Sequence, residues 1–242
     1  MKILFSGPTL HGALPPMPGV TVHPPAAAGD VAHAVGAGAR AIGLVDGVFG
    51  DVAAVWHKEI LFALSRGVTV MGAASMGALR AAECSAFGMI GIGEVFRRYQ
   101  DGRLDDDAAV AQLHAPPELG CTPLTEALVN VDATVEALSA EGDLAPDTAV
   151  RILSAARSLH FRRRTWDRIL DCADLDTETR LETARLVRSR FVNLKRMDAL
   201  LLCQALVVAS TDRRVVPDWH FNATGTFNAL LSSRSEAMLR RP

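Results

Sequence analysis

Short apolar runs alternate with helical stretches over the first third of the sequence, and this alternation restricts the fold more than any other feature. The runs are 3–5 residues long and mostly lack the apolar–polar alternation of a half-exposed strand, so they predict buried strands. They are residues 3–5, 20–22, 41–45 and 68–71. Helical patterns at 30–38 and 51–66 lie between them, the second with Asp51 as N-cap and Gly67 as C-cap. Because each parallel return needs a helix's length of chain, this order predicts an α/β fold with a small parallel sheet.

The pattern changes after about residue 120 to long helical periods with nothing that resembles a strand. These periods are 124–140, 146–159 and 177–208, the last with a possible break. We therefore expect a Rossmann-like or flavodoxin-like α/β domain followed by an all-helical C-terminal half. The expected boundaries are 1–115 for the α/β domain, 116–210 for a helical region packed on it, and 211–242 for an irregular tail.

Composition and charge exclude several classes of function. The chain of 242 residues is 49% apolar, and 25 Lys and Arg against 27 Asp and Glu give a net charge of −2. This balance offers no electrostatic reason to expect nucleic acid or an anionic membrane as partner. The four cysteines form no CxxC pair, the start MKILFSGPTL has too short an apolar run for a signal peptide, and no apolar stretch is long enough for a membrane helix. We therefore expect a cytoplasmic protein.

Polar and small residues follow three of the predicted strands, where ligands bind in open α/β sheets. Residues 6–9 (SGPT) follow the first strand, Asp46 and Gly47 follow the third, and residues 72–77 (GAASMG) follow the fourth. A carboxylate, a serine and several glycines therefore converge at one edge of the sheet.

The segment around Ser75 has the spacing of a nucleophile elbow, with alanine in place of the first glycine. Its small residues would let the strand turn sharply into a helix and lift the hydroxyl clear of the backbone, leaving the Met76 N–H free to stabilise an oxyanion. Two other interpretations remain open. Ser75 could be only a helix N-cap, or the helix N-terminus could bind an anion without covalent chemistry.

Three consecutive polar residues interrupt the otherwise apolar pattern of 51–66: His57, Lys58 and Glu59. Glu59 falls in the middle of the apolar arc, so a cation or strong donor should lie against it. His57 could be a satisfied core residue or a functional one.

The helix after Ser75 carries Arg80 and Glu83 three residues apart, a spacing that suits an ion pair within the helix. Arg80 could instead pair with Glu59 or hold a carboxylate ligand. Cys84 is best read as a small buried hydrophobe rather than a nucleophile.

Several strings in the sequence are specific enough to suggest a family. An Asp-Gly pair precedes an HKEI helix, and GAASMGALRAAE, FGMIGIG and DDD follow, with HAPPELGCTPLTEALVN further on. The region 3–130 resembles the TfuA-like proteins, with Cys84 standing where we would expect leucine. The resemblance implies partnership with a YcaO enzyme, which uses ATP to activate a backbone amide so that sulfur replaces its oxygen. It also implies a thiocarboxylated, ubiquitin-like sulfur carrier protein as the source of sulfide.

This resemblance suggests roles for the residues at the sheet edge. Releasing sulfide from a thiocarboxylate is acyl transfer, for which Ser75 would be the nucleophile and the N–H groups of Met76 and Gly47 the oxyanion donors. His57 or Lys58 would act as base.

The remaining candidates would support these groups. Glu59 or Asp46 would orient the base, while Arg80, Lys58 and the helix N-terminus at Gly77 would bind the anionic substrate. No metal or cofactor is expected. The alternative function is a non-catalytic adaptor that docks on YcaO and positions the precursor peptide or the sulfur donor. A small-molecule or nucleotide binder is weaker, because neither GPTLHG nor GAASMG matches a phosphate-binding fingerprint.

Overall fold

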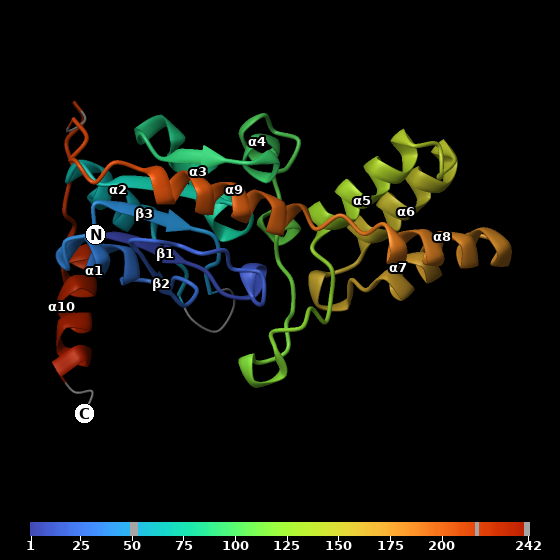
Figure 1. The fold of residues 1–242 in the computed structure, drawn as a ribbon, viewed down its shortest axis with the longest axis horizontal. Helices are drawn as coiled ribbons and strands as arrows, with labels where there is room; N and C mark the ends of the chain where they lie inside the picture. Colours follow the sequence, from blue (N-terminus) through green and yellow to red (C-terminus); the bar gives the residue numbers. More distant parts are fainter. Residues whose placement is uncertain (49–52, 216–217, 240–242) are drawn as a thin grey trace. The chain divides into compact units, whose positions relative to one another are not determined.

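The computed structural model describes residues 1–48, 53–215 and 218–239. It contains a five-stranded, all-parallel sheet with the strand order β2-β1-β3-β4-β5 (Figure 1). The strands are β1 (Lys2–Phe5), β2 (Val20–His23), β3 (Ala41–Leu44), β4 (Thr69–Ala73) and β5 (Ile90–Ile92). This is the flavodoxin-like order, in which the chain reverses its winding direction between β1 and β3. The structure confirms the predicted α/β fold.

Both faces of the three central strands are buried, and β1 shows how. Ile3 and Phe5 belong to an apolar cluster that includes residues of three helices, α1 (Asp30–Gly36), α2 (His57–Ser65) and α3 (Met76–Cys84). Leu4 belongs to a second cluster with Leu202 and Leu206 of α9 (Leu194–Val208). All three leucines are fully buried, and each contributes about 2 kcal/mol of hydrophobic stabilisation.

The second face needs α9 because the local connection is too short to cover it. Only the 3₁₀ helix η1 (Pro8–Leu10) forms a helix between β1 and β2. Gly43 on β3 leaves the necessary room, since a Cβ there would lie 2.7 Å from Leu202 Cδ2. A helix from far along the chain therefore completes the layer that a βαβ crossover supplies elsewhere.

Helix α2 begins later than the sequence pattern predicts. The helix expected from Asp51 starts at His57, and residues 53–56 are not helical; Asp51 itself lies outside the described residues. The cause is local: the Glu59 carboxylate accepts a hydrogen bond from the Trp56 N–H (3.1 Å), and the Glu59 N–H donates to the Trp56 carbonyl (3.0 Å). These two bonds pair the N–H groups of Trp56 and Glu59, so the first turn of the helix is capped at Trp56.

Two further elements complete this part of the chain, α4 (Glu94–Gln100) and α10 (Gly225–Leu239). The buried Asp198 carboxylate of α9 accepts hydrogen bonds from the N–H groups of Glu94 (3.0 Å) and Val95 (2.7 Å). It thereby caps α4, whose own N-cap residue Gly93 has no side chain.

Helix α10 corrects the expectation of an irregular tail from residue 211.

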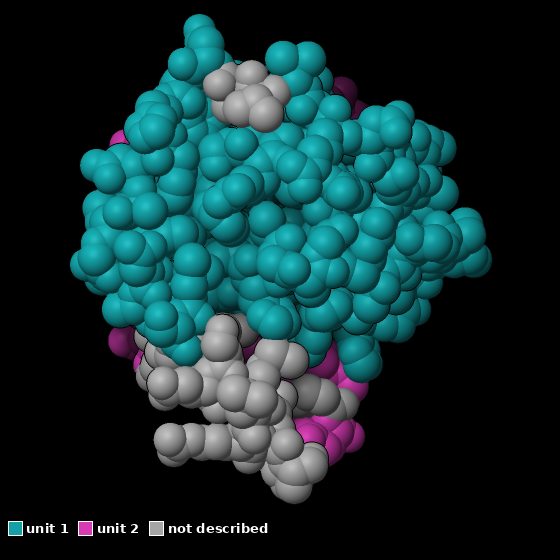
Figure 2. Space-filling view, turned by 90° about the vertical axis from the view of Figure 1, so that its left-hand side faces the viewer, with its two compact units in different colours: residues 1–103, 198–242 teal, residues 104–197 magenta. Residues whose placement is uncertain are grey.

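The described chain divides into two compact units, coloured separately in Figure 2. The first comprises residues 1–103 and 198–242, and the second residues 104–197. The division differs from the expected boundaries of 115 and 210, because α9 returns to the sheet from Asp198 onwards. None of the helices within the described residues is both long and apolar enough to cross a membrane.

The second unit is helical, as expected, and is arranged around α5 (Leu128–Ala140). Most residues of α5 are buried, including Val129, Val131 and Thr134. It contacts α6 (Pro146–Ser158) and α8 (Thr177–Ser189), and α7 (Trp166–Cys172) contacts both of these helices. The chain breaks between α8 and α9, where the sequence pattern predicted a possible interruption.

Two ionisable side chains of this helical unit, Lys195 and Glu126, are buried or partly buried. The Lys195 side chain is 4% exposed and its ammonium donates to the Val110 carbonyl (2.9 Å). Glu126 precedes α5, and its buried Oε2 has no hydrogen-bond partner among the described residues. Burial raises the pKa of Glu126 from 4.5 to about 7, with the positive charge of Lys195 acting in the opposite direction. Folding therefore favours the protonated form of Glu126.

This raised pKa predicts a pH-dependent effect of Glu126→Gln. The ionised carboxylate costs stability as pH rises from the unfolded-state value of 4.5 through about 7, and the neutral amide avoids that cost. The gain in free energy of unfolding should therefore be roughly 2 kcal/mol larger at about pH 8 than at about pH 5. Urea denaturation at both pH values measures it. Glu118→Gln, at an exposed position of the same unit, is the control; equal gains at both pH values for Glu126→Gln would contradict the prediction.

Candidate functional site

The loops after β1 and β3 are joined by Asp46 at the carboxyl edge of the sheet. Its carboxylate accepts hydrogen bonds from the N–H groups of Gly7 (2.9 Å) and Thr9 (3.1 Å) and from the Thr9 hydroxyl (2.6 Å). Asp46 is only 6% exposed. A carboxylate that accepts several hydrogen bonds in a buried setting fixes the backbone around it. The structure thus gives Asp46 the task of holding the β1 loop, and brings neither His57 nor Lys58 into hydrogen-bond contact with it.

A tight turn connects β4 to α3 and presents Ser75. Ala74 has φ of +67°, and the Ser75 N–H donates to the Ala73 carbonyl (2.8 Å), which makes a three-residue γ-turn. A positive φ costs an alanine about 1 kcal/mol or more, so the surrounding packing must hold the turn. Ser75 is half-buried, and its hydroxyl makes no hydrogen bond with the described residues. The turn therefore presents a hydroxyl that forms no hydrogen bond within the described part of the chain.

The packing that holds this turn comes from two glycines. A Cβ on Gly77 would lie 1.8 Å from the Leu44 carbonyl oxygen, and the Gly77 N–H donates to the Val45 carbonyl (3.1 Å). A Cβ on Gly47 would lie 2.6 Å from Met76 Cγ. The first turn of α3 thus lies directly on the backbone that follows β3.

The three candidate N–H donors differ in whether they already have a hydrogen-bond partner. The Gly77 N–H, expected to bind an anion, is occupied by Val45. The N–H groups of Met76 and Gly47 make no hydrogen bond with the described parts of the chain. Met76 is the first residue of α3, where the helix dipole favours negative charge. Of these three candidate donors, Met76 and Gly47 are consequently the two whose N–H groups have no partner among the described residues.

Glu59 lies apart from the other polar residues of α2. It is fully buried and accepts hydrogen bonds from the N–H groups of Trp56 (3.1 Å) and Ala32 (3.2 Å). Desolvation raises its pKa, and these backbone donors oppose the shift. The strong donors expected against Glu59 are therefore backbone amides, and the carboxylate ties the start of α2 to α1.

His57 and Lys58 face different parts of the structure. The Lys58 ammonium lies 5.4 Å from the centre of the Phe221 ring, at cation–π distance. His57 Nε2 lies 2.8 Å from Glu83 Oε2 and 3.4 Å from Arg80 Nη1. The carboxylate beside the histidine is thus Glu83 of α3, rather than Glu59 or Asp46.

Arg80 completes this cluster. Its Nη1 lies 2.6 Å from Glu83 Oε2, and its Nε donates to the Val55 carbonyl (3.0 Å). The pair within α3 therefore forms, and Arg80 makes no ion pair with Glu59 in the described structure. From the sequence, Glu83 was expected only as a partner of Arg80; its position two turns beyond Ser75 was the available signal for a role near the site.

Cys84, which lies on α3 with Arg80 and Glu83, is buried and unreactive. Cys84 is 1% exposed, and burial raises the pKa of its thiol to about 11. A thiol of this kind is not a nucleophile at neutral pH. The described residues also contain no group of three or more His, Cys, Asp or Glu side chains placed to hold a metal ion.

Comparison with known proteins gives one family. No curated protein matches the chain. A family model described as "TfuA-like protein" matches residues 46–165. The matched segment includes Asp46, α2, the turn at Ser75 and the whole of α3. The match confirms, over residues 46–165, the resemblance of the chain to the TfuA-like protein family.

Proposed function

We propose that this protein assists a YcaO enzyme in peptide backbone thioamidation by releasing sulfide from a thiocarboxylated sulfur carrier protein. The TfuA-like family is associated with YcaO-dependent thioamidation. The observation that carries the chemical part of the proposal is the strained turn at Ala74. There the Ser75 hydroxyl and the N–H groups of Met76 and Gly47 have no hydrogen-bond partner among the described residues. A nucleophile next to two unused donors suits acyl transfer.

The proposed reaction has two steps. Ser75 Oγ attacks the carbonyl carbon of the thiocarboxylate, and the Met76 and Gly47 N–H groups donate to the oxygen that gains charge. The carbon–sulfur bond then breaks, the proton taken from Ser75 passes from the base to the sulfur, which leaves as hydrosulfide, and the carrier remains as an ester on Ser75. Water hydrolyses the ester, which regenerates the hydroxyl and yields the carrier carboxylate. No redox partner is needed, since sulfur leaves in the oxidation state in which it arrived.

His57 is the preferred base in this scheme. Its Nε2 lies against the Glu83 carboxylate, which favours the neutral tautomer that carries its proton on Nε2 and leaves Nδ1 to accept the serine proton. Arg80 contacts the same carboxylate and fixes its position. Lys58 is less suited to the role of base, because its ammonium lies against the Phe221 ring.

The decisive experiment mixes the purified protein with a thiocarboxylated carrier and measures free sulfide and carrier carboxylate over time. Catalysed release of both products in equal amounts, over several turnovers and without YcaO, supports the proposal. If the protein releases no sulfide by itself yet still stimulates thioamidation by YcaO, the hydrolase model fails and the non-catalytic adaptor replaces it.

Glu83→Gln tests the positioning of the base. The amide cannot hold the imidazole as the carboxylate does, so kcat for sulfide release should fall by about 10-fold to 100-fold with little change in KM. The exposed ion pair contributes little to folding, so thermal unfolding should change only slightly. Glu182→Gln, an exposed position on α8, removes the same charge elsewhere and should leave kcat unchanged. An unaltered kcat in Glu83→Gln would remove Glu83 from the mechanism.

A further inference from the structure

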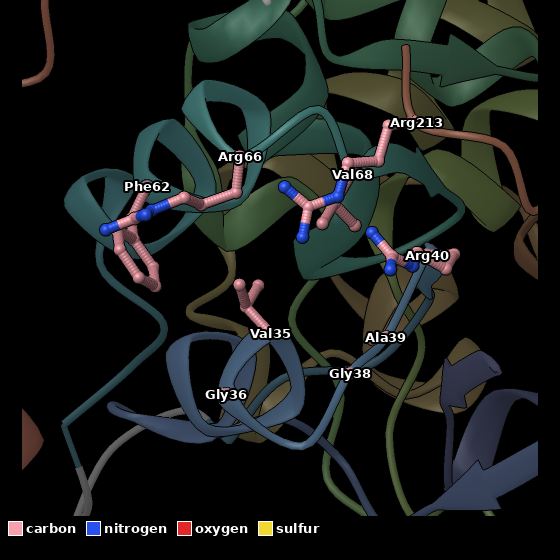
Figure 3. Close-up of a pocket in the computed structure, with 9 residues that line it drawn as sticks. All are labelled: Val35, Gly36, Gly38, Ala39, Arg40, Phe62, Arg66, Val68 and Arg213. Carbon is pink, nitrogen blue, oxygen red and sulfur yellow. The ribbon is translucent and has the colours of Figure 1, made fainter.

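A pocket of about 240 Å³ lies at the edge of the sheet opposite the Ser75 site, at the amino ends of β3 and β4 (Figure 3). Its walls come from the end of α1, the loop into β3, the end of α2 and the segment after α9. The apolar part of the lining includes Val35, Ala39 and Val68. A volume of this size suits a small ligand rather than a large one.

Three arginines from separate segments line this pocket: Arg40, Arg66 and Arg213. Figure 3 shows the guanidinium groups of Arg40 and Arg213 extending towards the space above Val35, while that of Arg66 lies along Phe62. The Arg66 guanidinium carbon is 5.2 Å from the centre of the Phe62 ring, which holds this cation at the wall of the pocket.

The positive charge of the pocket is not neutralised by the described residues. None of the three arginines forms an ion pair with a carboxylate there, whereas Arg80, Arg103 and others elsewhere do. Like charges gathered around a common space repel one another, and an anion between them would turn that repulsion into attraction.

Capping of helix carbonyls does not account for the cluster. Both α1 and α2 end near the pocket, and their carbonyl ends attract cations. Yet no guanidinium of the three donates a hydrogen bond to any described carbonyl. The neighbouring Arg214 behaves differently, since its Nη1 reaches the Gly88 carbonyl (3.4 Å). The donors of Arg40, Arg66 and Arg213 thus remain available to a ligand.

We infer that this pocket binds the phosphate or diphosphate group of a small molecule. Planar guanidinium groups bind phosphate oxygens in pairs, and three of them match a multiply charged anion better than a single carboxylate. The apolar wall formed by Val35, Ala39 and Val68 leaves space for an uncharged part of the ligand. The pocket is separate from the Ser75 site and does not depend on the proposed sulfide release.

The test measures binding of inorganic phosphate, pyrophosphate and ATP to the full chain by calorimetry at constant ionic strength, with acetate as the carboxylate control. Pyrophosphate or ATP should bind, and Arg40→Gln and Arg213→Gln should each weaken binding by at least about tenfold. Arg214→Gln removes the same charge from the adjacent residue and should change binding by less than about twofold. Ser75→Ala should bind as wild type does.

Comparison of the ligands identifies the source of the phosphate. Tighter binding of ATP supports a nucleotide, and equal binding of inorganic phosphate supports the free anion. Absence of binding by wild type, acetate binding as tight as that of pyrophosphate, or equal weakening in Arg214→Gln would overturn the inference. Thermal unfolding of each variant shows whether a loss of binding reflects a loss of fold.

Discussion

Ser75→Ala is expected to release sulfide from a thiocarboxylated carrier at least about 10³ times more slowly than wild type, because it removes the proposed nucleophile. The same change should alter the free energy of unfolding by less than about 0.5 kcal/mol, because the hydroxyl makes no capping bond to α3 and no other hydrogen bond with the described residues. The variant should therefore lose activity while keeping its stability. Initial rates of sulfide release and urea denaturation measure the two quantities.

Ser85→Ala, at the opposite end of α3, provides the matched control. Its hydroxyl donates to the Ala82 carbonyl (3.1 Å), so this serine has a partner within the fold. Its loss should leave sulfide release unchanged. Wild-type release by Ser75→Ala would show that another group attacks the substrate or that the protein acts without covalent chemistry.

The strands and most helices could be predicted because their residues are buried in a simple pattern. All-apolar runs such as 41–45 belong to strands covered on both faces. The strand β5 was missed because it has only three residues, all partly exposed, with Gly91 in the middle. A segment of this kind carries no periodicity from which a strand can be inferred.

The role of α9 could not be predicted for a different reason. The sequence pattern of a helix with one apolar stripe is the same whether the stripe packs on other helices or on a sheet. The missing information was that the β1–β2 connection contains only η1. That leaves a sheet face uncovered, and Leu202 and Leu206 fill it.

The candidate site was predictable where it depends on strand order and unpredictable where it depends on side-chain partners. The parallel sheet accounts for Asp46, Gly47 and Ser75 at one edge. Which carboxylate would face His57 depended on the packing of α2 against α3, and that contact selected Glu83. Glu59 was recognised as buried, but its donors lie on α1 and in the backbone before α2.

Gly77→Ala should destabilise the protein by about 3 kcal/mol. The added Cβ would lie 1.8 Å from the Leu44 carbonyl oxygen, which is backbone within the sheet and cannot rotate away. Alanine's better helix propensity would return up to about 1 kcal/mol, less than the cost of overpacking and of weakening the Gly77 hydrogen bond to Val45. Displacement of α3 should also move Ser75 and lower sulfide release. Urea denaturation measures the loss of stability.

Gly36→Ala separates the effect of the close contact from that of helix propensity. Gly36 lies at the end of α1, and a Cβ there would meet nothing within 4 Å. This variant should be as stable as wild type or more stable by up to about 1 kcal/mol. If Gly77→Ala proved as stable as Gly36→Ala, the tight approach of α3 to the β3 backbone would not be what holds the strained turn at Ala74, and another contact would have to do so.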